Sequence, residues 1–405
     1  MTGPGPAGVV VLAGISAALH VGKLPPALPV LREALGVTLL QAGFLLSLVQ
    51  LAGMLLGLAM GAAADALGGR RTMVLGLVVL GMAGLLGGFA TTPEVLLALR
   101  AAEGAGLLLA ALPAPGLIRR LVEPGRLSAT LGLWGAYMPI GTGLALLIGP
   151  GVMAAAGWQV WWWVVAACSL VMAAALRFAL PADPPARAQP ASARAGRIAR
   201  TLAAGGPWLV AITFATYSAQ WLAVIGFLPT IYAQSGLPAA YSAPATALAA
   251  TANMIGNIAS GRLLQRGVPA PVLLWTGFGA MACGAALAFA PWAADGSAAV
   301  AAVRYAGVLL FSAVGGLVPG TLFAVGVRLA PDDGTVSTTM GWVQQWSSLG
   351  QFGGPPLAAL LAAATGGWSA TWWLTGALAL AGAVLAGVIG RKVEQGRARA
   401  AAAAS

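Results

Sequence analysis

Charged residues are scarce in this chain of 405 residues. Only 8% of its residues are Asp, Glu, Lys or Arg, whereas 59% are hydrophobic, and the mean hydropathy is +0.88. A soluble domain carries about 25% charged residues, so this composition excludes an ordinary soluble protein. We therefore expect most of the chain to be embedded in a lipid bilayer.

Histidine and cysteine are also scarce, with one His and two Cys in the chain. Cys168 and Cys283 both lie in apolar runs, which is typical of small core residues and excludes a disulfide framework. A single histidine, without paired carboxylates inside the apolar runs, leaves a metal-dependent or aspartyl membrane enzyme without its ligands. The chain also lacks a nucleotide loop of the Gly-x-x-x-x-Gly-Lys-Ser type. We therefore expect no enzymatic activity, no ATP-driven transport and no cofactor.

Apolar runs separated by Gly, Pro and charge predict an all-α membrane protein with twelve transmembrane helices. We expect an N-terminal six-helix bundle at residues 1–180, a Pro-rich cytoplasmic linker at 181–206, a C-terminal six-helix bundle at 207–392 and a cytoplasmic tail at 393–405. The expected spans are 9–30, 41–64, 72–90, 95–118, 127–153, 159–180, 207–233, 242–264, 271–290, 298–325, 336–362 and 369–390.

The formal net charge of +11 is a signal of membrane orientation. If both termini are cytoplasmic, Arg32 is the only basic residue in an outer loop, while Lys23, Arg100 and Arg304 fall inside spans. All other Lys and Arg residues then lie on the cytoplasmic side, as the positive-inside rule requires, and no nucleic-acid partner is needed. The N-terminus has no basic region before its first apolar run, so no signal peptide is expected to be cleaved. We expect a monomeric, multi-pass plasma membrane protein, of the bacterial inner membrane.

The two halves of the sequence repeat each other at an offset of roughly 200 to 210 residues. The stretch around Trp134 is echoed around Trp342, and Arg100 is echoed by Arg304. Two parallel six-helix repeats are typical of one large class of secondary transporters.

The loop after the second expected span carries a longer motif, Gly61-Ala-Ala-Ala-Asp65-Ala-Leu-Gly68-Gly-Arg70-Arg71. It resembles the Gly-x-x-x-Asp-x-x-Gly-x-Arg-Arg signature of the major facilitator superfamily. The resemblance implies the major facilitator fold and a cytoplasmic gate in which Gly61, Asp65, Gly68, Arg70 and Arg71 latch the two halves in the outward-open state. The alternative is that the two arginines only satisfy the positive-inside rule.

Two further stretches carry the resemblance. Arg100 and Gly104 resemble the Arg-x-x-x-Gly motif of the same superfamily. The run Lys23-Leu-Pro-Pro-Ala-Leu-Pro29, together with Trp134, Tyr137 and Gly141, is similar to the branch that contains cyanate and nitroimidazole permeases.

Ionisable side chains inside the expected spans are candidate functional residues, because a charge at the bilayer centre costs roughly 2.5 to 3.5 kcal/mol. Glu103 is the only acidic residue well inside a span, and His20 precedes Lys23 by three residues, on the same helix face. At about 1.5 Å rise per residue, these residues lie at a depth similar to that of Arg100 and Arg304.

The resemblance implies that spans one, four, seven and ten surround a central cavity. Lys23, Arg100 and Arg304 would then face Glu103 alone, and this excess of positive charge predicts an anionic substrate. Three alternatives are structural: Arg100 braces helices by pairing with Glu103, Lys23 snorkels to the outer surface, and His20 is a hydrogen-bonded packing residue.

Polar and aromatic residues complete the predicted substrate site, the alternative being ordinary interhelical hydrogen bonds. These candidates are Trp134, Tyr137, Tyr217, Gln220, Gln344, Ser348 and Gln351. Asn253 and Asn257 are expected in a helix-packing seam, and Trp161 to Trp163 are expected to anchor the protein at the membrane surface.

The sequence thus predicts a secondary active transporter that works by alternating access, with a small anion and protons as partners in the lipid bilayer. Glu103 and His20 are the candidates for proton coupling, because they are the groups within spans that can change protonation near neutral pH. One alternative is a proton-driven exporter of hydrophobic drugs. Another is a membrane sensor that binds a ligand without transporting it.

Overall fold

The computed structural model describes residues 5–63, 68–123, 130, 133–134, 136–183, 190–292 and 297–404, and every regular element within these ranges is helical. In the N-terminal half the elements are α1 (Pro6–Gly22), η1 (Pro25–Ala27), α2 (Leu28–Leu35), α3 (Leu39–Ser47), η2 (Leu48–Gln50), α4 (Leu51–Ala63), α5 (Gly69–Gly87), α6 (Pro93–Ala111), α7 (Ala114–Leu121) and α9 (Tyr137–Ala179). After α10 (Ala191–Ala203) come α11 (Gly205–Gln234), α12 (Ala239–Gln265), α13 (Ala270–Phe289), α14 (Ala298–Gly315), α15 (Leu317–Arg328), η3 (Asp333–Thr335), α16 (Val336–Thr365), η4 (Trp368–Ala370) and α17 (Thr371–Ala404).

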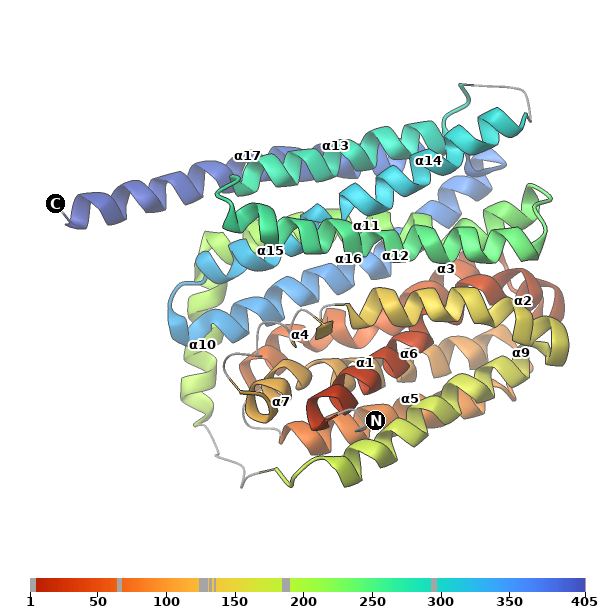
Figure 1. The fold of residues 1–405 in the computed structure, drawn as a ribbon, viewed down its shortest axis with the longest axis horizontal. Coiled ribbons are helices and arrows are strands. Elements are labelled where there is room, and N and C mark those ends of the chain that lie inside the picture. Colours follow the sequence, from red (N-terminus) through yellow and green to blue (C-terminus); the bar gives the residue numbers. More distant parts are fainter. Residues whose placement is uncertain are drawn as a thin grey trace.

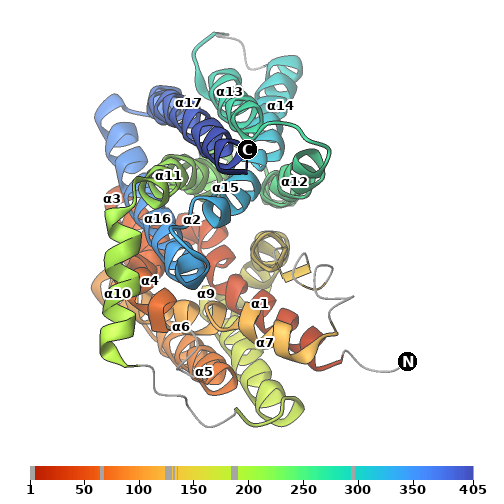
Figure 2. The same cartoon turned by 90° about the vertical axis from the view of Figure 1, so that its left-hand side faces the viewer.

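The helices form two groups that lie side by side with roughly parallel axes (Figure 1). Helices α1 to α9 make up one half and α11 to α17 the other, while α10 runs across the ends of both halves. In Figure 2, which looks onto that end, most helices are seen nearly end-on. We call this the linker end, and the end that holds η1 and α2 the opposite end.

Nine helical stretches among the described residues are long and apolar enough to cross a membrane. One of them, α9, includes residues of two expected spans, 127–153 and 159–180, because the chain reverses at Gly157 (Figure 1). Gly157 has a φ of 87° and a ψ of 162°, a backbone conformation that favours glycine. Within the described residues each of the twelve expected spans overlaps a helical segment, and the all-helical fold class is confirmed.

The first expected span, 9–30, is interrupted rather than continuous. Helix α1 ends at Gly22, and the chain passes through the 3₁₀ turn η1 before α2 begins. Pro25 and Pro26 lack the N–H groups that an α-helix needs at these positions. The break has a functional consequence, because it frees backbone carbonyl groups beside Lys23.

The two halves are in contact along α16, which packs against α3 and α4. Glycines permit this approach, since a Cβ at Gly53 would lie 2.4 Å from Ser348 Oγ and one at Gly57 would lie 2.9 Å from Gly341 O. Helices α9 and α12 form a second contact between the halves.

The two ends of the molecule differ in how the halves meet. At the opposite end one buried apolar cluster joins Leu28 and Leu31 of α2 with Phe227 of α11 and Ala359 of α16. At the linker end α7 packs on α1 and α5, and α15 packs on helices of its own half. The halves are therefore joined by a shared core at the opposite end and, toward the linker end, by the contact of α4 with α16.

Candidate functional site

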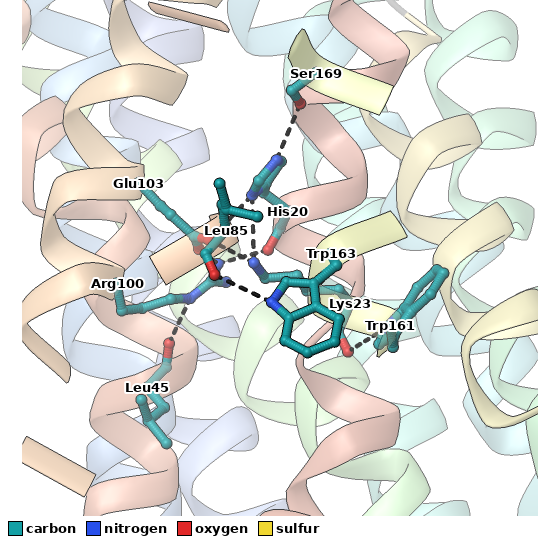
Figure 3. Close-up of polar contacts among 9 residues, drawn as sticks. All are labelled: His20, Lys23, Leu45, Leu85, Arg100, Glu103, Trp161, Trp163 and Ser169. Carbon is teal, nitrogen blue, oxygen red and sulfur yellow. Dashed lines mark hydrogen bonds and ion pairs between the residues drawn. The ribbon is translucent and has the colours of Figure 1, made fainter. Parts of the chain in front are cut away.

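Four ionisable side chains from α1, the turn that follows it and α6 meet in the interior of the N-terminal half (Figure 3). Glu103 Oε1 accepts an ion-paired hydrogen bond from Lys23 Nζ and lies 3.1 Å from His20 Nδ1. The second carboxylate oxygen, Oε2, accepts from Arg100 Nη1 at 2.5 Å. The four side chains are 0 to 2% exposed, so their charges interact with little screening by water.

The break after α1 supplies two acceptors to this cluster. Lys23 N–H donates the last α-helical hydrogen bond, to Leu19 O at 2.8 Å, and carbonyl groups at a helix end need other donors. His20 O accepts from Arg100 Nη1 at 2.6 Å, and Lys23 O accepts from Trp161 Nε1 at 3.1 Å. The prolines that end α1 thus help to hold Arg100 and Trp161 in place.

The end of α3, where the helix becomes the 3₁₀ turn η2, also binds the Arg100 side chain. Arg100 Nε donates to Leu45 O at 3.0 Å, just before α3 gives way to η2. Gly104 lets α6 approach this segment, since a Cβ there would lie 2.6 Å from Val49 O. Arg100 Nη2 is buried and has no hydrogen-bond partner among the described residues.

Tryptophans of α9 surround Lys23 and correct one expectation. Trp161 and Trp162 are 2% and 1% exposed, and Lys23 Nζ lies 4.8 Å from the centroid of the Trp162 ring. This geometry is a cation–π contact, so these two tryptophans are core residues of the site and were wrongly expected at the membrane surface. Trp163 is half-buried and donates to Leu85 O at 3.2 Å (Figure 3).

The alternatives for the charged residues have different outcomes. Lys23 is fully buried and paired, so it does not snorkel to the surface. Arg100 does pair with Glu103 at i, i+3, as the bracing alternative expected. Because Glu103 also pairs with Lys23 and contacts His20, the bracing pair is only one part of the cluster.

Arg304 corrects a further expectation, since it does not join these residues. It lies on α14 in the C-terminal half, donates to Ala288 O at 2.8 Å and stacks over Trp292 at 5.3 Å. A carbonyl at the end of α13 and an aromatic ring satisfy this guanidinium locally. The cluster thus holds two basic side chains, Lys23 and Arg100, against one carboxylate.

His20 has one partner that was not expected from the sequence. Its Nε2 lies 3.0 Å from Ser169 Oγ on α9 (Figure 3). Ser169 lies in an apolar run of the sequence, where one small polar residue gives no indication of a partner or a role. His20 is therefore a hydrogen-bonded residue, as its structural alternative expected, and its partners lie on two other helices.

Side-chain amides join the two halves near the middle of the helices. Gln50 Nε2 donates to Gln351 Oε1 at 3.0 Å, and Ser348 Oγ lies 3.4 Å from Gln50 Oε1. Closer to the linker end, Gln345 Oε1 accepts from Leu58 N at 2.8 Å. Two of the predicted polar residues of α16 thus face the N-terminal half, and Gln50 and Gln345 are additions that the sequence did not single out.

The other predicted residues contact their own halves. Tyr217 is hydrogen-bonded to Asn253, and Gln220 Nε2 donates to Thr216 O at 3.0 Å while its Oε1 is buried without a partner among the described residues. Gln344 is half-buried on α16. Trp134 and Tyr137 stack on each other at 4.2 Å and pack against α1, where a Cβ at Gly14 would lie 2.3 Å from the Trp134 ring. Their roles toward a substrate stay predictions.

The gate motif is described only in part, because Asp65 lies outside the described residues and Gly61 is described only as part of α4. Gly68 has a φ of 64° and precedes α5. The backbone N–H groups of Arg70 and Arg71 donate to the two carboxylate oxygens of Asp183, each at 2.9 Å. The Arg70 guanidinium donates to Leu180 O at 2.9 Å. These contacts tie the start of α5 to the segment after α9 within the N-terminal half.

Comparison with known proteins gives both a family and a fold. The family described as Major Facilitator Superfamily matches residues 9–353. A crystal structure of a bacterial homolog of the human lysosomal transporter Spinster, inward-facing and unoccupied, has 15% sequence identity and a TM-score of 0.67 over 96% of each chain. The inward-facing, occupied form has 15% identity and a TM-score of 0.73, covering 95% of this chain and 96% of that one. These structures are similar in fold. No curated protein matches this sequence.

Proposed function

This chain belongs to the Major Facilitator Superfamily, and from that premise we propose that it is a secondary active transporter that works by alternating access. It is a membrane transporter and not an enzyme. Its substrate passes between the two halves, residues 1–180 and 207–392, which rock against each other around residues near the bilayer midplane. The linker at 181–206 and the tail at 393–405 lie in the cytoplasm, because the basic residues gather there.

In this assignment the linker end faces the cytoplasm and the opposite end faces outward. The apolar cluster shared by α2, α11 and α16 closes the outer side, and α4 and α16 join the halves toward the cytoplasmic side. Outward opening requires that the shared cluster separate and that the gate motif around Asp65 and Arg70 latch the cytoplasmic ends.

The substrate is a small anion. The observation that carries this proposal is Arg100 Nη2, which is buried and has no hydrogen-bond partner among the described residues. It belongs to a cluster with two basic side chains and one carboxylate, and a guanidinium fork suits an anion with two acceptor oxygens. The resemblance of the Lys23 to Pro29 run to cyanate and nitroimidazole permeases supports a small substrate.

Transport is coupled to protons through Glu103 and His20. In the described conformation Lys23, Arg100 and His20 all contact the Glu103 carboxylate. An anion that engages Lys23 and Arg100 competes with Glu103 for these donors, and Glu103 then gains from binding a proton. Anion binding and proton binding thereby favour each other, as reciprocal coupling requires.

Uptake into proteoliposomes tests this function. The purified monomer is reconstituted, and radiolabelled cyanate, nitrate and short carboxylates are offered with and without a pH gradient. The proposal expects one of these anions to accumulate only when the gradient is present. Gradient-driven export of a neutral hydrophobic dye, with no anion uptake, would instead indicate a drug exporter. Saturable anion binding without any flux would indicate a sensor.

A further inference from the structure

We propose that Ser169 is a positioning residue that provides Nε2 of His20 with a hydrogen-bond partner in both protonation states, while Glu103 selects the tautomer of the ring. The consequence for transport rests on the proton coupling proposed above. The geometry itself is independent of that function, and so is the test described below.

The His20 ring is held by three other helices. Nδ1 lies 3.1 Å from Glu103 Oε1 on α6, and Nε2 lies 3.0 Å from Ser169 Oγ on α9. The ring is 0% exposed, and a Cβ at Gly84 on α5 would lie 3.0 Å from its Cε1. Gly84 thus leaves just enough room for the ring. With the ring held in place, its hydrogen bonds to Glu103 and Ser169 can change only through the positions of protons.

The charged groups around His20 come from two places. Lys23 Nζ, from the turn after α1, lies 3.4 Å from Nδ1, and α6 contributes Glu103 together with Arg100, which binds the far oxygen of that carboxylate. Helices α5 and α9 present Gly84 and Ser169, neither of which is charged. All charges therefore act on the Nδ1 side, and Ser169 is the group that faces Nε2.

This asymmetry selects one neutral tautomer. The Lys23 ammonium can only donate and the Glu103 carboxylate can only accept, and the carboxylate is the nearer of the two to Nδ1, at 3.1 Å against 3.4 Å, so the geometry favours a proton on Nδ1. Nε2 then carries a lone pair, and the Ser169 hydroxyl donates to it. The opposite tautomer would leave the Nδ1 lone pair facing the Glu103 oxygen.

A hydroxyl also serves the protonated ring. When His20 binds a second proton, Nε2–H becomes a donor and Ser169 Oγ accepts from it. The hydroxyl proton can then turn to a carbonyl one turn back in α9, as serine does within helices. Rotation of one O–H bond thus lets His20 keep both hydrogen bonds without moving, whereas alanine at position 169 would leave Nε2 without a partner in either state.

Nitrogen NMR provides a direct test, because His20 is the only histidine in the chain. The full chain, purified with a tag free of histidine, is labelled with ¹⁵N-histidine and placed in lipid nanodiscs. We expect the wild type to show a protonated Nδ1 and a hydrogen-bonded, unprotonated Nε2. In Ser169→Ala the Nε2 resonance should move to that of a nitrogen without a hydrogen bond. Ser169→Thr should restore the wild-type spectrum.

Ser312→Ala is the matched control. Ser312 is a buried serine of the C-terminal half, and its Oγ lies 3.4 Å from Trp221 Nε1 of the same half. The His20 spectrum of this variant should equal that of the wild type. A wild-type spectrum with the proton on Nε2 would overturn the proposal, even if Ser169→Ala fails to fold. Equal Nε2 resonances in wild type and Ser169→Ala would also overturn it. Absence of gradient-driven uptake in the wild type would refute the proposed function and leave this spectral test intact.

Discussion

The side-chain amide of Gln50 donates a hydrogen bond of 3.0 Å to Gln351, which lies in the other half of the molecule. We predict that this bond stabilises the contact between the halves. Hydrogen bonds between membrane helices contribute about 0.6 kcal/mol on average. A double-mutant cycle of Gln50→Ala and Gln351→Ala, measured by unfolding in lipid or detergent, should give a coupling energy of that size. Additive effects of the two changes would contradict the contact.

Gly57 should set how closely the halves approach near the linker end. A Cβ there would lie 2.8 Å from Gln345 Cβ and 2.9 Å from Gly341 O, so Gly57→Ala forces α4 and α16 apart, at a cost of about 1 to 3 kcal/mol. Spin labels at the linker ends of α4 and α16 should show a longer distance. Gly279→Ala is the control, because no heavy atom lies within 4 Å of its Cβ position. Identical distances in both variants would refute the prediction.

Asp183 should stabilise the start of α5. Its carboxylate accepts two backbone N–H groups at 2.9 Å each, so Asp183→Ala should lower the free energy of unfolding by about 0.5 to 2 kcal/mol, as for other helix caps. Arg200→Ala serves as control, because the Arg200–Asp332 pair has exposed side chains and such pairs contribute about 0 to 1 kcal/mol. Equal melting temperatures for the two variants would argue against the capping role.

The buried cluster predicts an order of stability among charge variants. Lys23→Gln leaves Arg100 paired with Glu103, whereas Glu103→Gln leaves Lys23 and Arg100 as two buried cations without a counter-ion. Leaving a buried charge uncompensated costs about 3 to 5 kcal/mol. We therefore expect Glu103→Gln to melt at a lower temperature than Lys23→Gln, and added anion to stabilise Glu103→Gln more. The reverse order would show that Glu103 is not the counter-ion of this cluster.

Much of the fold and part of the site could be predicted from the sequence, for physical reasons. A charge inside an apolar span must find a partner, so the depth of Lys23, Arg100 and Glu103 was enough to bring them together. Arg304 was misplaced because the internal repeat gives its position in a helix but not its neighbours, and Trp292 and a free carbonyl satisfy it locally.

Other features were not predictable from residue types. A Trp run such as Trp161 to Trp163 has the same composition whether it faces lipid or surrounds a lysine. The role of the break at Pro25 also depends on three-dimensional contacts. The carbonyl groups that it frees stabilise the site only because Arg100 and Trp161 donate hydrogen bonds to them. Ser169 gave no signal, since one hydroxyl in an apolar run acquires a role only from the ring beside it.

The central claim is that Glu103 couples proton binding to anion transport, and Glu103→Gln in proteoliposomes tests it most directly. With the radiolabelled anion that the wild type accumulates, the variant should still exchange internal for external substrate but should show no accumulation when a pH gradient is imposed. The amide resembles the protonated carboxyl in shape, so substrate exchange survives while proton release does not. Accumulation at the wild-type level in Glu103→Gln would contradict the account.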